Sequence, residues 1–300
     1  MRILVTGSSG FVAGHVCDAL CADGHDVVGI DVKAPREGSP ETHIRKDVRD
    51  AFFPEGSGFD AAIHMAAFGG VSFAAKHPRQ IFESNVDATI QLVDQLRKMP
   101  ELKRVILASS FSVYGNQCPV TEESPVAPIE TYAASKLAQE LCFRGAPLPL
   151  SVLRFSSVYG RRMRLDDSEA TIMAKLVGWI SRGDAFEINE DGYQTRDFVH
   201  VGDVVDAIRG LLASAAPSGV VHPRQALVNV CTGEAITLRR TIETLSQILG
   251  KPAKVEYNGK ARPGDMRDCR GGDVSRLRGL LGRSPTTFAL GAIEAFAGLA

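Results

Sequence analysis

A tyrosine and a lysine four residues apart, Tyr132 and Lys136, form the pair with the clearest chemical potential in this sequence. If their segment is helical, both side chains lie on one face, because positions i and i+4 are neighbours on a helix. An ammonium close to a phenol favours the phenolate, which lowers the tyrosine pKa from its usual value of roughly 10. The pair predicts a general base that works near neutral pH, although a half-buried tyrosine beside a solvated lysine has the same spacing.

A glycine-rich turn close to the start of the chain predicts a phosphate-binding site. Residues 6–14 read TGSSGFVAG and lie between an expected strand and an expected helix. Gly7 permits a tight turn and Gly10 a close approach of the backbone. The amides at the start of the helix, at Phe11 and Val12, can then receive a pyrophosphate. An ordinary strand-to-helix turn is the alternative for this segment taken alone.

Asp31 ends the next expected strand, about 20 residues after the turn. A carboxylate at this place bonds the adenosine ribose hydroxyls and repels a 2′-phosphate, so it favours NAD over NADP as the cofactor. Lys33 and Arg36 are nearby cations that keep NADP open. The ends of the two following strands, Asp47-Val48 and His64-Met65-Ala66-Ala67, would line the same crevice. Small residues there let a cofactor lie flat, but simple packing room would explain the alanines equally well.

Short apolar runs alternate with amphipathic stretches through the first half of the chain, which predicts a doubly wound α/β fold. Near-continuous apolar strands separated by helices imply a parallel sheet covered on both faces. The clearest helix in this half, residues 78–98, opens on Pro78 and carries apolar residues at helical spacing. The expected strands are residues 3–6, 27–31, 61–66, 105–109 and 151–155.

After Gly160 the pattern changes to a polar, charge-rich stretch, which predicts the start of a second region. The most distinct helix in this part, residues 238–249, has Thr237 as its N-cap and Gly250 as its stop signal. Further elements are expected at 170–182 and 203–214, both helical, and at 227–230, a strand.

The bulk composition narrows the class of partner. The chain has 300 residues, 44% of them hydrophobic and 23% charged, with a formal net charge of −1. A globular protein of this charge is expected to bind a small molecule, and neither nucleic acid nor an anionic membrane. The six cysteines show no C-x-x-C spacing, which fits reduced thiols and no metal site. With no signal sequence and no membrane-length apolar run, a cytoplasmic location is expected.

Further motifs follow these features in a fixed order along the chain. The full series is Gly7-x-x-Gly10, Asp31, Asp47-Val48, His64-x-Ala66-Ala67, Asn85-Val86, Ser109-Ser110-x-x-Val113-Tyr114-Gly115, Tyr132-x-x-x-Lys136, Arg154 before Val158-Tyr159-Gly160, Arg196-Asp197-Phe198-Val199-His200-Val201, and Arg262-Pro263-Gly264-Asp265. It resembles the extended short-chain dehydrogenases/reductases, namely the NAD-dependent sugar-nucleotide epimerases and dehydratases, and most of all UDP-sugar 4-epimerases. The chain departs from that family at Ala13, where a third glycine is usual.

The resemblance implies a catalytic group of Ser110, Tyr132 and Lys136. Tyr132 would be the base, Lys136 would stabilise its phenolate and bind the nicotinamide ribose, and Ser110 would hold the sugar oxygen. The residues that the resemblance assigns to NAD are Gly7, Gly10, Phe11, Val12, Asp31, Asp47, Val48, Ala66, Ala67, Asn85, Ser109, Tyr132 and Lys136.

The same resemblance implies a nucleotide-sugar substrate and a homodimer. The residues assigned to the substrate are Ser110, Ser157, Arg196, Arg262 and Cys269, with Ser157 in the place of the family's usual asparagine. The dimer would form through residues 78–98 and the helix after Lys136, which Gly145 and Pro147 shorten. We expect residues 1–161, joined again by 197–232, to form the NAD-binding domain, and residues 162–196 and 233–300 the smaller substrate domain.

Phe111 and Ser112 bear on the type of reaction. Family dehydratases place an Asp and a Glu directly after the catalytic hydroxyl, and decarboxylases keep a Glu there, whereas this chain has neither. Oxidation and reduction at C4 remain. A 4-epimerase acting on UDP-glucose/galactose, a UDP-N-acetylhexosamine or UDP-glucuronate is favoured, since Asp31 favours a recycling NAD.

Two other functions stay open. One is a 4-ketoreductase acting on an NDP-4-keto-6-deoxyhexose, which would have to exchange its cofactor at each turnover. The other is a non-catalytic NAD-binding regulatory protein, which the intact set of Ser110, Tyr132 and Lys136 disfavours.

Overall fold

A seven-stranded sheet forms the centre of the larger part of the molecule. The computed structural model describes residues 1–54, 57–165, 170–214, 227–260 and 271–299. Neighbouring strands of the sheet are parallel and run in the order β11-β6-β5-β4-β1-β2-β3. Their bounds are β1 (Arg2–Thr6), β2 (Asp26–Asp31), β3 (Thr42–Arg45), β4 (Ala61–His64), β5 (Arg104–Ser110), β6 (Leu150–Phe155) and β11 (Leu227–Val230).

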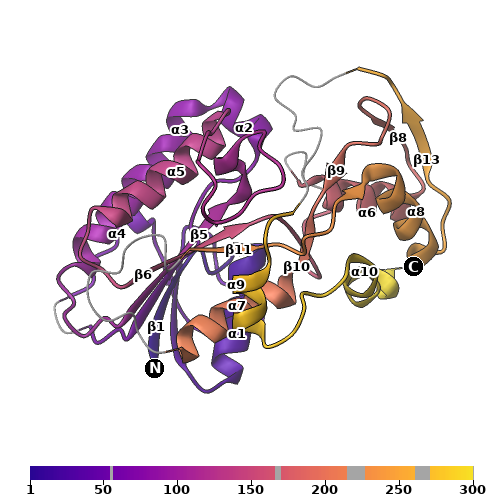
Figure 1. Ribbon diagram of the computed structural model, residues 1–300. Helices are drawn as coiled ribbons and strands as arrows, with labels where there is room; N and C mark the ends of the chain where they lie inside the picture. The colour runs from indigo at the N-terminus through magenta and orange to yellow at the C-terminus, as the bar shows by residue number, and fades with distance from the viewer. Residues whose placement is uncertain (55–56, 166–169, 215–226, 261–270, 300) are drawn as a thin grey trace.

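Helices cover both faces of this sheet, as Figure 1 shows. On one face lie α1 (Phe11–Ala22), α7 (Val201–Ala213) and α9 (Ser275–Leu281), which share one apolar core with the strands. On the other face, α4 (Ala88–Leu96) and α5 (Thr131–Arg144) contribute to a second core. Coverage on both sides explains why the strands are apolar almost without interruption. The structure confirms the doubly wound parallel fold.

A second, smaller layer of short strands and helices lies beside the sheet (right side of Figure 1). Its helices surround an apolar core that includes Tyr159 and Phe288. The elements of this part are the strand pairs β7 (Ser157–Tyr159) with β10 (Phe198–His200), β9 (Thr195–Arg196) with β12 (Ile236–Thr237) and β8 (Ala185–Ile188) with β13 (Lys254–Tyr257), and the helices α6 (Ile172–Arg182), α8 (Leu238–Leu249) and α10 (Phe288–Phe296).

The chain passes between the two parts more than once. After β10 it enters α7, which packs against α1, and it then supplies β11 as the edge strand beside β6. After β12 and α8 it returns a last time through α9, which packs on α7. Residues from both halves of the sequence therefore meet at the sheet.

The expected long helix at residues 78–98 is interrupted. It consists of α3 (Pro78–Phe82), a π-helical turn (Glu83–Asp87) and α4. The π turn contains Asn85, whose buried side chain accepts a hydrogen bond from Phe68 N at 2.7 Å. A π turn contains one residue more than an α turn, and the apolar pattern of the sequence does not show where such a residue is inserted.

Element ends follow local hydrogen bonds. Strand β4 ends at His64, two residues before the expected end, because the amides of Met65 and Ala66 both donate to Thr6 Oγ1 at 3.1 Å. Helix α8 has the expected bounds, and Thr237 Oγ1 accepts from Arg240 N at its start. The remaining segments are α2 (Val71–Lys76) and three 3-10 turns, Val48–Asp50, Phe111–Tyr114 and Ala297–Leu299.

Candidate active site

Ser110 and Tyr132 meet at the carboxyl end of the central sheet. Ser110 ends β5, and Tyr132 lies in the first turn of α5, where Glu130 accepts hydrogen bonds from Tyr132 N at 2.7 Å and Ala133 N at 2.9 Å. The side chains of Ser110 and Tyr132 are hydrogen-bonded to each other.

The direction of this bond follows from the partners of Ser110. Its hydroxyl oxygen accepts from the amide and the hydroxyl of Ser112, at 3.2 and 3.0 Å. With both lone pairs occupied, the Ser110 hydroxyl proton is free to donate to the Tyr132 oxygen. A serine in this state stabilises a tyrosinate, and equally an oxygen that develops negative charge on a substrate.

The pKa of Tyr132 corrects one expectation from the sequence. The pKa of Tyr132 is raised to about 12, mainly by burial and also by the Glu130 carboxylate, while the hydrogen bond to Ser110 acts in the opposite direction. The predicted direction was therefore wrong for the protein alone, because burial disfavours the phenolate. Lys136 Nζ donates instead to Gln139 Oε1 at 2.7 Å.

Lys136 itself is 4% exposed and belongs to the protein interior. Burial lowers the pKa of Lys136 to about 8, and the Glu140 carboxylate acts in the opposite direction. The lysine is thus mostly charged at neutral pH and loses its proton in mildly basic solution. A buried ammonium one helical turn from a half-buried tyrosine is an arrangement that suits proton transfer at a hydroxyl group.

The glycine-rich turn has the shape that a dinucleotide needs. Gly7 has a φ of +74°, and a Cβ there would lie 2.9 Å from the Cα and N of Ala66. Gly10 is the N-cap of α1 without a side-chain cap, so the first amides of the helix, at Phe11 and Val12, remain available to an anion. The turn therefore packs directly against the loop that contains Ala66, with no room for a side chain at position 7.

Asp31 is fixed beside this turn. Its carboxylate accepts from Ser9 N at 3.1 Å and Lys33 N at 2.8 Å, which places it between the turn and the loop that follows β2. Arg36, the cation that kept NADP open, is paired with Asp18 at 2.8 Å and Glu41 at 3.6 Å. Two carboxylates therefore hold the guanidinium, and the site fits NAD, as the sequence predicts.

The other residues assigned to the cofactor lie around the same edge, and several have structural partners. Asp47 is paired with Arg49 at 2.8 Å, and this bond lowers the pKa of Asp47. Val48 is buried, and Ala67 follows Ala66 in the loop after β4. Asn85 ties that loop to α5, because it bonds Phe68 and also donates to Ser135 Oγ at 3.0 Å.

Ser109 points into the interior, away from Ser110. Its hydroxyl donates to Glu140 at 2.6 Å, and Glu140 forms a buried two-bond ion pair with Arg154 at 2.9 and 2.7 Å. This cluster joins β5, β6 and α5, the elements that carry Ser110, Tyr132 and Lys136. Its role in the described structure is to hold these elements together.

Two of the residues assigned to the substrate, Ser157 and Arg196, lie on short strands of the smaller part. Ser157 begins β7, and its amide donates to the Asp197 carbonyl at 3.0 Å. Arg196 lies in β9 and donates to the Thr195 carbonyl at 2.7 Å. Arg262 and Cys269 lie outside the described residues.

Sequence reasoning missed two residues that contact this group directly. Gln139 accepts the hydrogen bond of Lys136, and Glu130 caps the helix that carries Tyr132. The available signal for Gln139 was its position three residues after Lys136 on the same helix. Within the described residues, no cluster of three metal-ligating side chains occurs, and no helix is long and apolar enough to span a membrane.

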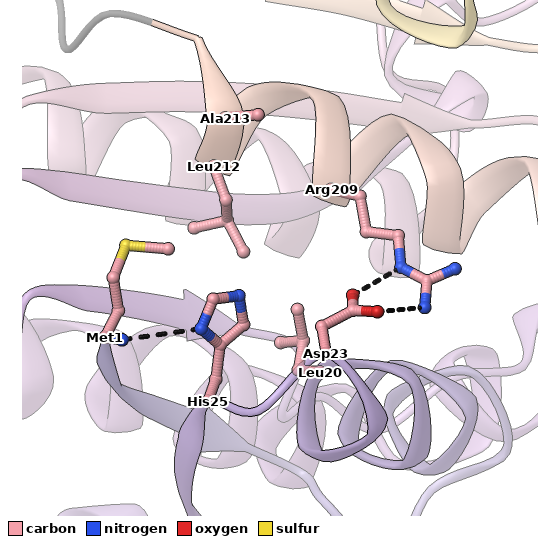
Figure 2. A pocket seen from close by; sticks show the side chains of 7 residues that line it. All are labelled: Met1, Leu20, Asp23, His25, Arg209, Leu212 and Ala213. Carbon is pink, nitrogen blue, oxygen red and sulfur yellow. Dashed lines mark hydrogen bonds and ion pairs between the residues drawn. The ribbon is translucent and has the colours of Figure 1, made fainter.

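A cavity of about 330 Å³ lies elsewhere, beside the first residues of β1 and β2 (Figure 2). Its polar groups are paired with each other: Arg209 binds Asp23 at 2.7 and 2.8 Å, and the amino group of Met1 lies 3.4 Å from His25 Nδ1. These strands end on the glycine-turn side, so this cavity is at the opposite edge of the sheet from Ser110 and Tyr132.

Comparisons with known proteins agree with this geometry. The sequence model described as "NAD dependent epimerase/dehydratase family" matches residues 3–228. A UDP-glucose 4-epimerase of Mycolicibacterium smegmatis is 32% identical over 308 residues, covering 95% of this chain and 94% of the relative.

Two solved structures are similar over the full length. MoeE5 in complex with UDP-glucuronic acid and NAD has a TM-score of 0.87 and 28% identity, covering 100% of this chain and 98% of MoeE5. A UDP-glucuronic acid 4-epimerase of Bacillus cereus, in complex with UDP-glucuronic acid and NAD, has a TM-score of 0.87 and 27% identity at the same coverage.

Proposed function

The chain belongs to the NAD dependent epimerase/dehydratase family, and on this premise we propose that it is an NAD-dependent UDP-sugar 4-epimerase. The observation that carries the proposal is the group of Ser110, Tyr132 and buried Lys136 at the strand edge that also carries the glycine turn. It supplies a base and a hydrogen-bond donor for one hydroxyl group of a sugar. The similarity to 4-epimerases supports C4 as the reacting carbon.

The residues after Ser110 support epimerisation over dehydration. Phe111 is buried and packs edge-to-face on Tyr114 at 5.6 Å, and Ser112 donates to Ser110. Loss of water from a sugar requires an acid and a second base, and neither of these side chains is one. Ser112, at a position where a dehydratase would carry an acidic residue, thus serves to orient the Ser110 hydroxyl.

Proton movements follow from the positions of the side chains. Bound NAD would be held by the glycine turn and Asp31, and it supplies the hydride acceptor and donor. The Tyr132 phenolate, which does not form at neutral pH in the protein alone, would be favoured by the positive nicotinamide ring of bound NAD. The phenolate would then remove the proton of the C4 hydroxyl while Ser110 donates a hydrogen bond to the oxygen. The Lys136 ammonium stabilises the charge on the phenol. When the sugar has rotated so that its opposite face is directed toward the cofactor, Tyr132 returns the proton to the C4 oxygen.

The nucleotide diphosphate would be bound by the smaller part of the molecule, residues 162–196 and 233–300 apart from α9, which packs against α7 in the larger part. Arg196 supplies a cation, and Ser157 lies on β7 where the two parts join. UDP-glucose and UDP-glucuronate are the first substrates to test, because they occur with the similar proteins. UDP-N-acetylglucosamine is the third.

The proposal includes a homodimer formed through α3, α4 and α5. Phe82, Ile90 and Leu141 on these helices are exposed by 41%, 43% and 56%. Apolar residues on three adjacent helices form a surface that a second copy would bury. Light scattering after gel filtration tests this, with the mass of a dimer expected and loss of the dimer on Leu141→Glu. A monomeric wild type would contradict it.

Tyr132→Phe is the variant that tests the catalytic group. We expect it to abolish C4 inversion of UDP-glucose and UDP-glucuronate while NAD remains bound, because the ring stays and only the proton acceptor is lost. Turnover and cofactor content are measured on the same preparation. Full activity of Tyr132→Phe would exclude this mechanism.

A further inference from the structure

A buried network of hydrogen bonds leads from Lys136 into the interior of the protein. Its members are Lys136, Gln139, Thr89, His64 and Thr6, and the last four are each at most 1% exposed. They come from α5, α4, β4 and β1. Because none reaches water, each donor and acceptor must find its partner within the chain, and the protonation of every member can be worked out.

The accounting starts at Thr6, which precedes the glycine turn. Thr6 Oγ1 accepts from Met65 N and Ala66 N, so its own proton must go to His64 Nδ1 at 2.7 Å. His64 is therefore neutral with its proton on Nε2. That proton goes to Thr89 Oγ1 at 2.9 Å.

Thr89 donates its own proton to the Asn85 carbonyl at 2.6 Å and so can only accept from the other side. It accepts from Gln139 Nε2 at 2.8 Å, and the second Nε2 proton goes to the Asn85 carbonyl at 3.1 Å. Gln139 Nε2 also lies 3.2 Å from His64 Nε2, but in this assignment both nitrogens are donors and the contact is not a hydrogen bond. The amide of Gln139 can lie in one orientation only. Its Oε1 faces Lys136 Nζ, at 2.7 Å.

This network needs Lys136 to be charged for its bond to Gln139 to be strong, and it needs His64 to be neutral. A second proton on His64 would point at Thr6 Oγ1, which has no lone pair left. The pKa of His64 is lowered to about 3, mainly by burial and also by the Lys136 charge. His64 thus keeps one protonation state at every pH at which the protein would work.

We propose that Gln139 is a positioning residue for Lys136: the chain from Thr6 through His64 and Thr89 fixes the Gln139 amide, whose oxygen holds the lysine ammonium in place and in its charged form. The kinetic part of this inference rests on the proposed function, whereas the titration of Lys136 does not. The hydrogen-bonded network also connects Lys136 to Thr6, which directly precedes the glycine turn.

Other charged groups around Lys136 set the background against which Gln139 acts. Tyr132 lies on the same helix and is neutral until strongly basic pH. Glu140 is bound to Arg154, Ser109 and Arg144, so its charge is shared among several partners. His64 is neutral. Loss of the Gln139 oxygen therefore leaves the Lys136 ammonium with no close neutral acceptor among the members of this hydrogen-bonded network.

The test is the titration of Lys136 in the protein without substrate. Lysine labelled with 13C at Cε is observed by NMR, and the Lys136 signal is identified by its absence in Lys136→Arg. In the wild type we expect a midpoint at pH about 8. In Gln139→Met, which keeps the chain length and removes the acceptor, the midpoint falls by roughly one pH unit. In Gln139→Glu the added carboxylate raises it above the wild-type value.

Gln95→Met is the matched control. Gln95 lies on α4, and its amide likewise uses both ends, accepting from Phe53 N at 2.8 Å and donating to the Ala51 carbonyl at 2.6 Å. We expect Gln95→Met to destabilise the protein and to leave the Lys136 midpoint unchanged. A wild-type midpoint in folded Gln139→Met overturns the proposal. If Gln139→Met does not fold, the Lys136 midpoint is measured in Gln139→Glu. A midpoint equal to that of the wild type in Gln139→Glu likewise overturns the proposal.

Turnover supplies the second readout. For a UDP-sugar that the wild type epimerises, we expect Gln139→Met to lower kcat about tenfold with little change in KM, and to move the basic limb of the pH profile down by roughly one unit. A merely structural role would leave the pH profile in place. If no UDP-sugar is epimerised by the wild type, the proposed function fails while the NMR titration still decides the role of Gln139.

Discussion

The buried ion pair of Glu140 and Arg154 gives the sharpest stability prediction. The two side chains are at most 2% exposed and share two hydrogen bonds, of 2.9 and 2.7 Å. Arg154 also lies over the ring of Tyr114, 4.6 Å from its centroid. The substitution Arg154→Met keeps much of the apolar stem and leaves Glu140 buried with only Ser109 and the half-buried Arg144 as partners.

The magnitude follows from the asymmetry of buried pairs. Removing one partner of such a pair costs about 3–5 kcal/mol, because the remaining charge stays buried, whereas replacing both partners by apolar groups is often close to neutral. We therefore expect Arg154→Met and Glu140→Met each to lower the free energy of unfolding by about 3–5 kcal/mol. The double variant should lose less free energy of unfolding than the sum of the two single losses. The coupling energy should be about 2 kcal/mol or more, which lies within the range measured for residues in contact.

The assay is urea unfolding of the four proteins of this double-mutant cycle, followed by circular dichroism. Arg276→Met is a suitable control, because its ion pair with Glu123 is 36% and 52% exposed, and such a pair contributes about 0–1 kcal/mol. If the two buried substitutions are additive, or if neither exceeds the Arg276→Met effect, the pair does not hold the strands and α5 together as described.

Three further predictions concern the cofactor site and Lys136. Gly7→Ala should abolish NAD binding, because its Cβ would meet the Ala66 backbone. Gly24 has a φ of +80° and open space around it, so Gly24→Ala should only lower the free energy of unfolding, by about 1–2 kcal/mol. NAD titration and thermal unfolding of both variants distinguish the two effects. Asp31→Asn should weaken NAD binding roughly tenfold and narrow the preference over NADP, which competitive binding of both nucleotides measures. The pKa of Lys136 in the folded protein lies below its value of 10.5 in the unfolded protein, so its contribution to stability is lost as pH falls through about 8. Relative to Lys136→Met, the free energy of unfolding of the wild type should rise by up to about 3 kcal/mol between pH 8 and 10.5. A difference between the two proteins in urea unfolding that does not change with pH would refute the pKa shift.

The sequence predicts the elements whose signals are local. Helix 238–249 has its N-cap at Thr237 and its stop at Gly250, and both ends are confirmed because capping depends on a few neighbouring residues. The strands in the middle of the sheet were also found, because both of their faces are buried and their apolar runs are uninterrupted. Strand β3 at the edge is partly exposed, and it ends at Arg45, before the expected end at Asp47-Val48. The end of β4 was placed two residues late, because the Thr6 hydroxyl that removes those amides from the sheet is distant in sequence.

Electrostatic properties of the site were harder to predict than its members. The sequence brings Tyr132 and Lys136 onto one helix, but the direction of the Tyr132 shift depends on burial by the whole fold. Gln139 has no motif of its own. Its role depends on Thr89, His64 and Thr6 from three other elements, whose approach no pattern along the chain records.

The most direct test of the account is the reaction of UDP-glucose and UDP-glucuronate in D2O without added cofactor, followed by proton NMR. We expect inversion at C4 with the original hydrogen retained there and no deuterium at C5, because the proton handled by Tyr132 is that of the hydroxyl oxygen and the carbon-bound hydrogen moves as hydride. Deuterium at C5, release of water from the sugar, or no inversion of either sugar or of UDP-N-acetylglucosamine would contradict it.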